Sequence, residues 1–344
     1  MKNLNQIERI KVKLRLAKNT DSFFEVFGAD SHQYVLSEPA SVEEVEIFER
    51  KYSIKLPLEY CDFLTKIGNG GIDYRESVVG NSGAGPDYGI FKLGNSSHFM
   101  VDHSLGYLKE EPYFNSKITK DEWYKLFGDI TDDEYDKVMA NAYRGILAIG
   151  FSGCAGYMGI MLTGNDKGKV LNIYDELEYC PNFVKEANFL DWYENWLDQI
   201  ISGLRILSNE GDSMSESECF DRYLEDEEPC WKIVSLGYIR SRDSLSGESI
   251  DILWSKYCAE GDEDIKLYIL NLLAKFDYQK VKNELNKLYL VNPIEFLKIL
   301  HLYAPNKTSE WQSVIQELQN KALNFEVAEY IKYVTIDDMP AISN

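Results

Sequence analysis

The chain lacks the sequence features of most metal, redox and membrane proteins. It has only four histidines among 344 residues, its six cysteines show no CxxC spacing, and no apolar run approaches the ~20 residues needed to cross a bilayer. The first 21 residues show an interrupted helical pattern instead of the apolar core of a signal peptide. We therefore expect a protein that is made and kept in the cytoplasm and that does not bind a membrane.

The cysteines are scattered along the chain, at Cys61, Cys154, Cys180, Cys219, Cys230 and Cys258. Without paired spacing they fit neither a zinc site nor a disulfide framework. We expect reduced and mostly buried thiols, with Cys154 as a small core residue.

Basic residues are scarce relative to acidic ones. The chain has 36 Lys and Arg against 57 Asp and Glu, a net charge of −21. Phosphate binding needs clustered Lys and Arg, so we do not expect nucleic acid as a direct partner. The basic and acidic counts are 12 and 14 for residues 1–100, 11 and 27 for 101–228, and 13 and 16 for 229–344. The acidic middle third is either an ordinary solvated face or a surface that attracts a basic partner.

Hydrophobic spacing predicts a helix within residues 1–22, and Ser41 and Glu44 form the capping box of a second helix. Pro57 opens a third helix that should end at Gly68. Strand-like runs cover 88–93, 145–151, 157–164 and 169–175, and the last two should form a β-hairpin around residues 165–168. An amphipathic helix is predicted over 189–201.

The pattern changes after a polar stretch at 208–217, which is the predicted linker. Helices should begin near Glu248, Asp262, Asp277, Asn292, Ser309 and Asn324. Helix pairs would then repeat every ~30 residues, as in a HEAT-like solenoid, but an ordinary helical bundle fits equally well. The predicted organisation is an N-terminal helix (1–22), an α+β domain (23–207), the linker and a helical domain (218–344).

No set of residues has the spacing of a catalytic, metal or cofactor site. Residues 68–71 read GNGG, but a phosphate-binding loop needs a strand before its glycines and a helix after them. Here the glycines follow a helix, so we interpret Gly68 as its left-handed end. His98 and His103 cannot share one helical face, and the turn at 152–156 has no identifiable histidine partner. We expect no enzyme activity and no cofactor.

Four blocks of sequence resemble the SUKH superfamily, which includes a fungal regulator of cell-wall assembly and many bacterial toxin-immunity proteins. They are FERKYSIKLPLEYCDFLTKIGNGG (48–71), GAGPDYGIFKLG (83–94), GILAIGFSGCAGYMGIMLTGNDKGKVLNIYD (145–175) and FLDWYENWLDQI (189–200). The resemblance covers about residues 23–203. It implies an α+β fold, a mixed sheet with flanking helices, here followed by an all-α domain. The matching structural positions are Pro57, Gly70, Gly71, Gly85, Pro86, Gly150, Gly153, Trp192 and Trp196.

The resemblance implies a non-catalytic module that binds another protein, most simply a cognate toxin domain that it silences. A basic toxin domain would suit the acidic middle third. Two stretches, 72–82 and 95–144, are insertions relative to many relatives, and the second is rich in acids. The first candidates for partner contact are therefore Glu110, Glu111, Asp132, Asp133 and Glu134. A regulatory scaffold, or an enzyme with an unrecognised site between domains, stays open as an alternative.

Overall fold

The computed structural model describes residues 2–71, 82–94, 100, 105–125, 130–206, 214–321 and 325–334. Contacts divide the chain into an α+β unit, formed by Met1–Lys18 and Phe24–Asp198, and a helical unit, formed by Asn19–Phe23 and Gln199–Asn344. The predicted domain boundaries stay predictions, because most of the proposed linker falls on residues 207–213, outside the described part of the chain.

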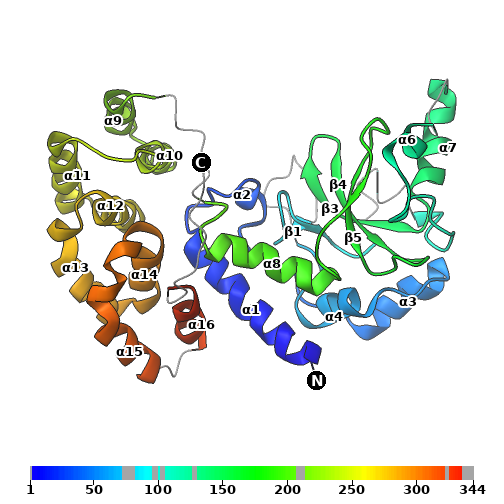
Figure 1. The fold of residues 1–344 in the computed structure, drawn as a ribbon, viewed down its shortest axis with the longest axis horizontal. Helices are drawn as coiled ribbons and strands as arrows, with labels where there is room; N and C mark the ends of the chain where they lie inside the picture. The colour runs from blue at the N-terminus through cyan, green and yellow to red at the C-terminus, as the bar shows by residue number, and fades with distance from the viewer. Residues whose placement is uncertain are drawn as a thin grey trace. The chain divides into compact units, whose positions relative to one another are not determined.

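The α+β unit is built on a sheet of six described strands that follow one another in chain order (Figure 1). The strands are β1 (Ser82–Gly83), β2 (Ile90–Phe91), β3 (Ile146–Gly153), β4 (Gly156–Met161), β5 (Val170–Tyr174) and β6 (Asn182–Phe183). The α+β class and the β4–β5 hairpin are confirmed. However, every described pair is antiparallel, so the sheet is not mixed as the resemblance implied. Each strand pairs with its neighbour in sequence, and such neighbours need no parallel crossover.

Seven described helices belong wholly or mainly to this unit. They are α1 (Lys2–Thr20), α2 (Ala29–His32), α3 (Val42–Tyr52), α4 (Leu58–Lys66), α6 (Lys120–Tyr124), α7 (Asp132–Ala142) and α8 (Phe189–Ile201). The bounds of α8 agree with the predicted helix, and the capping box of Ser41 and Glu44 opens α3 as predicted. The sequence pattern did not predict α6 and α7, which lie in the acid-rich stretch 95–144.

Aromatic side chains join α4 to α8. The ring centroid of Phe189 lies 4.9 Å from those of both Tyr60 and Phe63. Tyr193 continues this cluster, and its hydroxyl donates a 2.8 Å hydrogen bond to the carbonyl oxygen of Ala84 beside β1. Because all four side chains are almost completely buried, this cluster forms a large part of the core of the unit.

Helix α1 runs beside α8 and is held to it by charged side chains (Figure 1). Glu194 accepts hydrogen bonds from Arg9 at 2.7 Å and from Lys13 at 2.8 Å. Burial alone would raise the pKa of Glu194, but these two cations outweigh it and lower the pKa to about 2. The carboxylate therefore stays ionised and paired, which fixes the N-terminal helix on the α+β unit.

The glycines after α4 serve backbone packing. The left-handed residue is Gly70, with a φ of 63°, and not Gly68 as predicted. Gly68 instead lies so close to Leu36 and Ser37 that an added Cβ would come within 3 Å of them. A Cβ on Gly70 or Gly71 would likewise come within 3 Å of the backbone of β1 or β2. Because these glycines have no Cβ, the chain of the GNGG turn can pass close to the backbone of the β1–β2 hairpin.

The other predicted structural positions also lie at close packing points. Pro57 is the N-cap residue of α4, and Pro86 accepts a hydrogen bond from Gly89 in the turn before β2. Added Cβ atoms on Gly85, Gly150 and Gly153 would come within 3 Å of neighbouring atoms, and Trp192 and Trp196 are buried on α8. Their assignment as family-specific structural residues stays a prediction.

The helical unit consists of helices in sequential pairs (Figure 1). They are α9 (Glu216–Glu225), α10 (Pro229–Arg240), α11 (Gly247–Ala259), α12 (Glu263–Phe276), α13 (Tyr278–Val291), α14 (Pro293–Lys298), α15 (Gln312–Lys321) and α16 (Phe325–Val334). A π-helical turn, η2 (Ile299–Tyr303), continues α14, and a 3-10 segment, η3 (Pro305–Trp311), precedes α15. The helices predicted to begin near Asp262, Asp277 and Asn292 do begin there, and each of these residues accepts hydrogen bonds from the first helical turn as the N-cap. Helices α9 and α10 were missed in the sequence.

Two short segments from outside the helix pairs pack inside this unit. Phe23 stacks on Tyr268 with a centroid distance of 4.6 Å, and the carbonyl oxygen of Asn19 accepts a hydrogen bond from Lys298. From the segment that follows α8, the carbonyl oxygen of Ile206 accepts a 2.8 Å hydrogen bond from Arg240. Residues 19–23 and 199–206 are thus part of the helical core.

The cysteine prediction was partly wrong. All six thiols are free, but only Cys219 is buried, and Cys154 is exposed at the β3–β4 turn instead of lying in the core. Within the described residues, no helix combines the length and the apolar character that a membrane crossing requires.

Candidate partner-binding surface

A hollow of about 400 Å³ opens at one end of the sheet in the α+β unit. Its floor is the β3–β4 turn, residues 152–156, and its wall is formed by Tyr174, Glu176 and Tyr179. The turn is tight because Gly153 has a φ of 97° and Cys154 a φ of 50°. The hydrogen bond from the Asp175 N–H to the Ala155 carbonyl, 2.9 Å long, ties the floor to the wall.

Aromatic side chains surround this hollow, which we call the tyrosine hollow. The rings of Tyr174 and Tyr179 have centroids 5.4 Å apart, and Tyr179 is 51% exposed. On the other side of the turn, Phe27 is 59% exposed, and the centroid of its ring lies 5.2 Å from that of Tyr88. A Cβ on Gly153 would come within 4 Å of both of these rings, so they adjoin the floor of the hollow. Exposed aromatic residues of this kind commonly carry binding energy at protein interfaces.

The loop that carries the wall is anchored by residues of the acid-rich stretch 95–144. The indole Nε1–H of Trp123 donates to the carbonyl oxygen of Leu177 at 2.8 Å. The hydroxyl of Tyr135 accepts from the N–H of Leu177 and donates to the carbonyl of Asp175, each at 3.0 Å. The side chain of Leu177 is also buried, with 1% exposed, so the loop is held by both its backbone and one core side chain. Helices α6 and α7 therefore position residues 175–179.

The electrostatics of the hollow are acidic. Glu176 is exposed and lines it, whereas Glu178 is exposed nearby in the same loop. Partial burial raises the pKa of Asp175, whose carboxylate accepts a 3.3 Å hydrogen bond from the Tyr157 hydroxyl. The eight lining residues include no Lys or Arg. The hollow therefore offers negative charge next to aromatic surface.

The five predicted contact residues do not form one cluster around the hollow. Glu110 and Glu111 are exposed near the far end of the β4–β5 hairpin, where the Glu110 carbonyl accepts a 2.7 Å hydrogen bond from Thr163. Asp132 and Asp133 lie in the first turn of α7, and Glu134 follows them. Because Tyr135 contacts the loop at 175–177, this second group is on the side of the hollow.

Glu134 has a structural role that the sequence analysis missed. Its carboxylate accepts hydrogen bonds from the N–H and hydroxyl of Thr131, at 3.1 and 2.9 Å, in the capping box of α7. These bonds lower the pKa of Glu134. Conversely, Glu176 and Tyr179 were not singled out, although the acid-rich run after the predicted strand at 169–175 was visible in the sequence.

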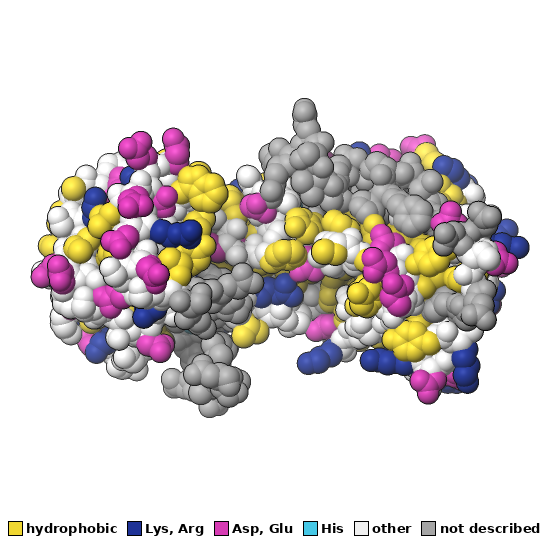
Figure 2. All heavy atoms as spheres, turned by 90° about the horizontal axis from the view of Figure 1, so that it is seen from above, with side chains coloured by type: hydrophobic (Ala, Val, Ile, Leu, Met, Phe, Trp, Pro, Cys, Tyr) yellow, Lys and Arg dark blue, Asp and Glu magenta, His cyan; other side chains and the backbone are white. Residues whose placement is uncertain are grey.

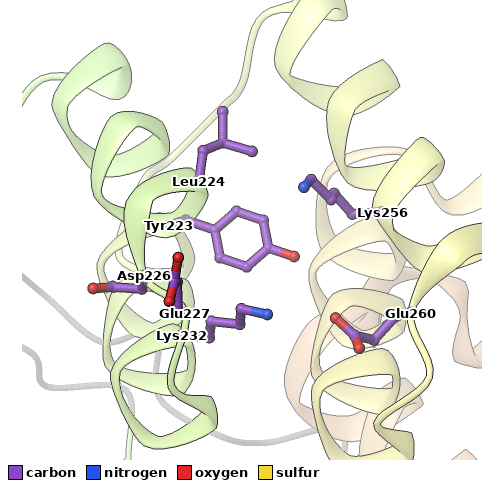
Figure 3. A pocket seen from close by; sticks show the side chains of 7 residues that line it. All are labelled: Tyr223, Leu224, Asp226, Glu227, Lys232, Lys256 and Glu260. Atoms are coloured by element: carbon purple, nitrogen blue, oxygen red, sulfur yellow. The ribbon is translucent and has the colours of Figure 1, made fainter.

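The helical unit has a second hollow, of about 390 Å³, with a different charge pattern. Its lining residues are Tyr223, Leu224, Asp226, Glu227, Lys232, Lys256 and Glu260 (Figure 3). Figure 3 shows the Tyr223 hydroxyl directed toward Lys256 and Glu260. Burial and the charge of Glu260 raise the pKa of this hydroxyl to about 12, so it stays protonated at neutral pH. Two lysines offset the three carboxylates, so this hollow has no strong preference of sign.

Figure 2 shows one face of each unit. On both units, hydrophobic, acidic and basic side chains are interspersed on this face.

Away from the hollow, the buried histidine of the α+β unit makes structural contacts. His32 is 1% exposed, its Nδ1 accepts the N–H of Tyr34 at 3.0 Å, and burial lowers its pKa to about 4. Across the part of the chain that the structure describes, no group of three or more His, Cys, Asp or Glu could hold a metal ion. His98 and His103 lie outside the described residues.

Comparison with protein-family models matches residues 39–195 to the SMI1 / KNR4 family (SUKH-1). The match covers slightly less than half of the chain and supports the resemblance of this part to the SUKH superfamily. The match runs from just before α3 into α8, so it includes the β3–β4 turn and the loop at 175–179. Comparison of the chain with curated proteins and with solved structures found no match to either. The SUKH assignment is consistent with a non-catalytic module of the immunity or regulatory kind.

Proposed function

We propose that this protein is an immunity protein whose SUKH domain binds a basic toxin domain and occludes its active site or substrate path. The tyrosine hollow carries the proposal, because it combines exposed aromatic surface with the exposed carboxylate of Glu176, on a loop that is held by hydrogen bonds. Such inhibition needs no catalytic residue. It requires an interface of standard size, about 1,600 Å² in total, that excludes water from a few central contacts.

The proposed surface differs from the one that the sequence alone suggested. Its centre is the tyrosine hollow with the first turn of α7 beside it, and Glu110 and Glu111 would contact the toxin only if the interface extends along the hairpin. The acidic middle third would speed association with a basic partner, since opposite potentials steer the encounter. The proposed place of action is the cytoplasm, with neither nucleic acid nor membrane as a direct partner.

The first test is co-expression with the toxin encoded beside this protein, followed by measurement of association kinetics at several salt concentrations. Protection, a stable complex and association that slows as salt is raised are the expected results. Failure to protect and to bind would contradict immunity. Association that does not depend on salt would refute the electrostatic part of the proposal.

Paired charge variants can locate the surface. Two double variants remove the same charge from opposite ends of the hairpin. The first is Glu176→Gln with Glu178→Gln, and the second is Glu110→Gln with Glu111→Gln. A matched pair, Glu225→Gln with Glu227→Gln, removes it from exposed positions of the helical unit. We expect the first pair to slow association most. Glu134 is left intact, because its substitution would also remove the cap of α7.

We also propose that the helical unit is a short HEAT-like solenoid. Its supporting features are the starts of α9, α11 and α13 at residues 216, 247 and 278, two steps of 31 residues. Helix α10 packs on α12, α12 packs on the turn η2 that continues α14, and α14 packs on α16. A regulatory scaffold remains the second candidate function. Trp231, which is 60% exposed on α10, favours it as a contact for another protein.

A further inference from the structure

We infer that the tyrosine hollow is a receptor for one arginine side chain of the partner. The inference rests on the proposed function for the identity of the protein that supplies the arginine, but the chemistry of the hollow stands independently of it. A guanidinium is planar, is always charged at neutral pH and is less strongly hydrated than an ammonium. It therefore fits a site that offers ring faces and a carboxylate together.

The walls of the hollow supply the aromatic part of this chemistry. Tyr174 and Tyr179 are inclined at 42° with ring centroids 5.4 Å apart, and both line the hollow. A Cβ added to Gly156 would lie 4.0 Å from the Cε1 atom of Tyr174 and 3.3 Å from the Gly153 carbonyl oxygen, so a larger residue would place its side chain against this ring. With glycine at this position, no side chain of residue 156 covers the ring, and a cation in the hollow can reach it.

Glu176 supplies the charge. Its carboxylate lines the same hollow, and it is the only ionisable acid or base in the lining besides the Tyr hydroxyls and the Cys154 thiol. No basic side chain of the lining competes for it. Glu178 lies two residues further along the loop, is also exposed and does not line the hollow, so it provides a matched comparison.

The hollow is already formed in the free protein. The loop at 175–179 is held by the hydrogen bonds of Trp123 and Tyr135 to Leu177, and its last turn is closed by a 3.1 Å hydrogen bond from Tyr179 N–H to the Glu176 carbonyl. The ring of Tyr174 belongs to a residue whose N–H donates to the Tyr143 hydroxyl at 3.2 Å. A site with fixed walls loses less entropy on binding than one that must be ordered.

The test titrates the isotope-labelled full-length chain with three small probes and follows the backbone amide signals of Gly153 and Gly156 by NMR. The probes are N-acetyl-arginine methylamide, its lysine counterpart and its citrulline counterpart, which keeps the shape of arginine without the charge. We expect saturable shifts with the arginine probe, at least threefold weaker binding of lysine, and no saturation with citrulline. Equal responses to arginine and citrulline, or no response at these amides, would overturn the inference.

Four variants assign the contacts. Glu176→Gln should weaken binding of the arginine probe about fivefold or more, whereas Glu178→Gln should change the affinity less than twofold. Tyr179→Ala should weaken binding of the arginine probe about threefold. Tyr179→Phe, which retains the ring, should bind the probe as tightly as the wild type does. If Glu176→Gln and Glu178→Gln behave alike, the hollow is not the site.

The toxin measurement separates the two proposals. A protein that binds the arginine probe but no toxin would keep the arginine site and contradict immunity. A toxin complex whose dissociation rate is unchanged by both Glu176→Gln and Tyr179→Ala, together with no response to the arginine probe, would keep immunity and overturn the arginine site.

Discussion

Trp123 and Leu177 are joined by a 2.8 Å hydrogen bond from the indole Nε1–H to the main-chain carbonyl, although 54 residues separate them in sequence. Trp123 is 0% exposed and belongs to the acid-rich stretch 95–144, whereas Leu177 belongs to the loop that forms the wall of the tyrosine hollow. The acid-rich stretch thus contributes a buried aromatic support to the proposed binding surface, in addition to its charge.

Replacing this indole tests the support directly. Trp123→Phe should leave the Leu177 carbonyl without its buried donor and should lower the free energy of unfolding by about 2 kcal/mol. The loop would lose one of its anchors, so toxin binding and the arginine probe should both weaken. Chemical denaturation and the NMR titration measure the two effects.

A matched control lies in the helical unit. Trp311 is 3% exposed, and its Nε1–H donates to the Tyr278 hydroxyl. Trp311→Phe should destabilise the helical unit without changing the response to the arginine probe. Equal loss of binding in both variants would mean that the hollow responds to general destabilisation and not to its support by Trp123.

The glycine turn gives a second prediction. Gly71→Ala should lower the free energy of unfolding by about 2 kcal/mol or more, because the new Cβ would overlap the backbone of Ser82 and Gly83. The cost arises from close approach, since Gly71 is not among the residues of positive φ. Thermal or denaturant unfolding would measure it.

Gly106→Ala is the control for this substitution, because no atom lies within 4 Å of its added Cβ. Its stability should change by less than about 0.5 kcal/mol. Saturable binding of a nucleotide to the wild type that disappears in Gly71→Ala would reverse the structural interpretation of the GNGG turn.

Local signals in the sequence predicted those parts of the fold that depend on neighbouring residues. Asp277 and Asn292 cap their helices because a side-chain oxygen reaches the first helical turn, a relationship within three or four residues. The hairpin of β4 and β5 was predictable for the same reason. By contrast, α10 begins at Pro229 after a run of acids, and its apolar residues do not follow one clear stripe, so it was missed.

The candidate site could not be read from the sequence because it depends on distant contacts. Tyr135 bonds to residues 40 and 42 positions away, and only the fold brings them together. Charge counting selected Glu134 because it lies in the most acidic part of the chain, but the same carboxylate caps α7. Composition identified an acidic region and gave no information on which carboxylates lie beside aromatic rings.

His32 predicts how stability depends on pH. Burial lowers its pKa from 6.5 to about 4, so the folded protein keeps this ring neutral while the unfolded chain takes up a proton below pH 6.5. Stability should therefore fall as the pH decreases from 6.5 to 4, by about 3 kcal/mol at most. Urea unfolding at half-unit pH steps would measure this slope.

His32→Asn removes the titrating group and keeps an acceptor near the Tyr34 N–H. Although less stable overall, this variant should lose the part of the slope between pH 6.5 and 4 that belongs to His32. The pair of Glu194 with Arg9 and Lys13 acts in a different window, because the pKa of Glu194 is lowered from 4.5 to about 2. Its stabilisation is present above pH 4.5 and is lost below it. If His32→Asn showed the same dependence of stability on pH between 6.5 and 4 as the wild type, His32 would not control acid sensitivity.

The last prediction concerns the connection between the two predicted domains. Proteolysis should cut the polar stretch near Gly211, which the sequence marks as a linker, yet the two fragments should stay associated. Residues 19–23 and 199–206 would remain on the N-terminal fragment while belonging to the packed helical unit. Phe23 stacks on Tyr268, Lys298 donates to the Asn19 carbonyl, and Arg240 donates to the Ile206 carbonyl. The nicked protein should therefore elute as one species in gel filtration and separate only in denaturant.

Phe23→Ala should lower the denaturant concentration at which the fragments separate. Phe27→Ala, at a ring that is 59% exposed in the α+β unit, should leave that concentration unchanged. Two folded fragments that separate freely at micromolar concentration would mean that these segments do not hold the helical unit, and would favour the simpler division of the chain at residues 208–217.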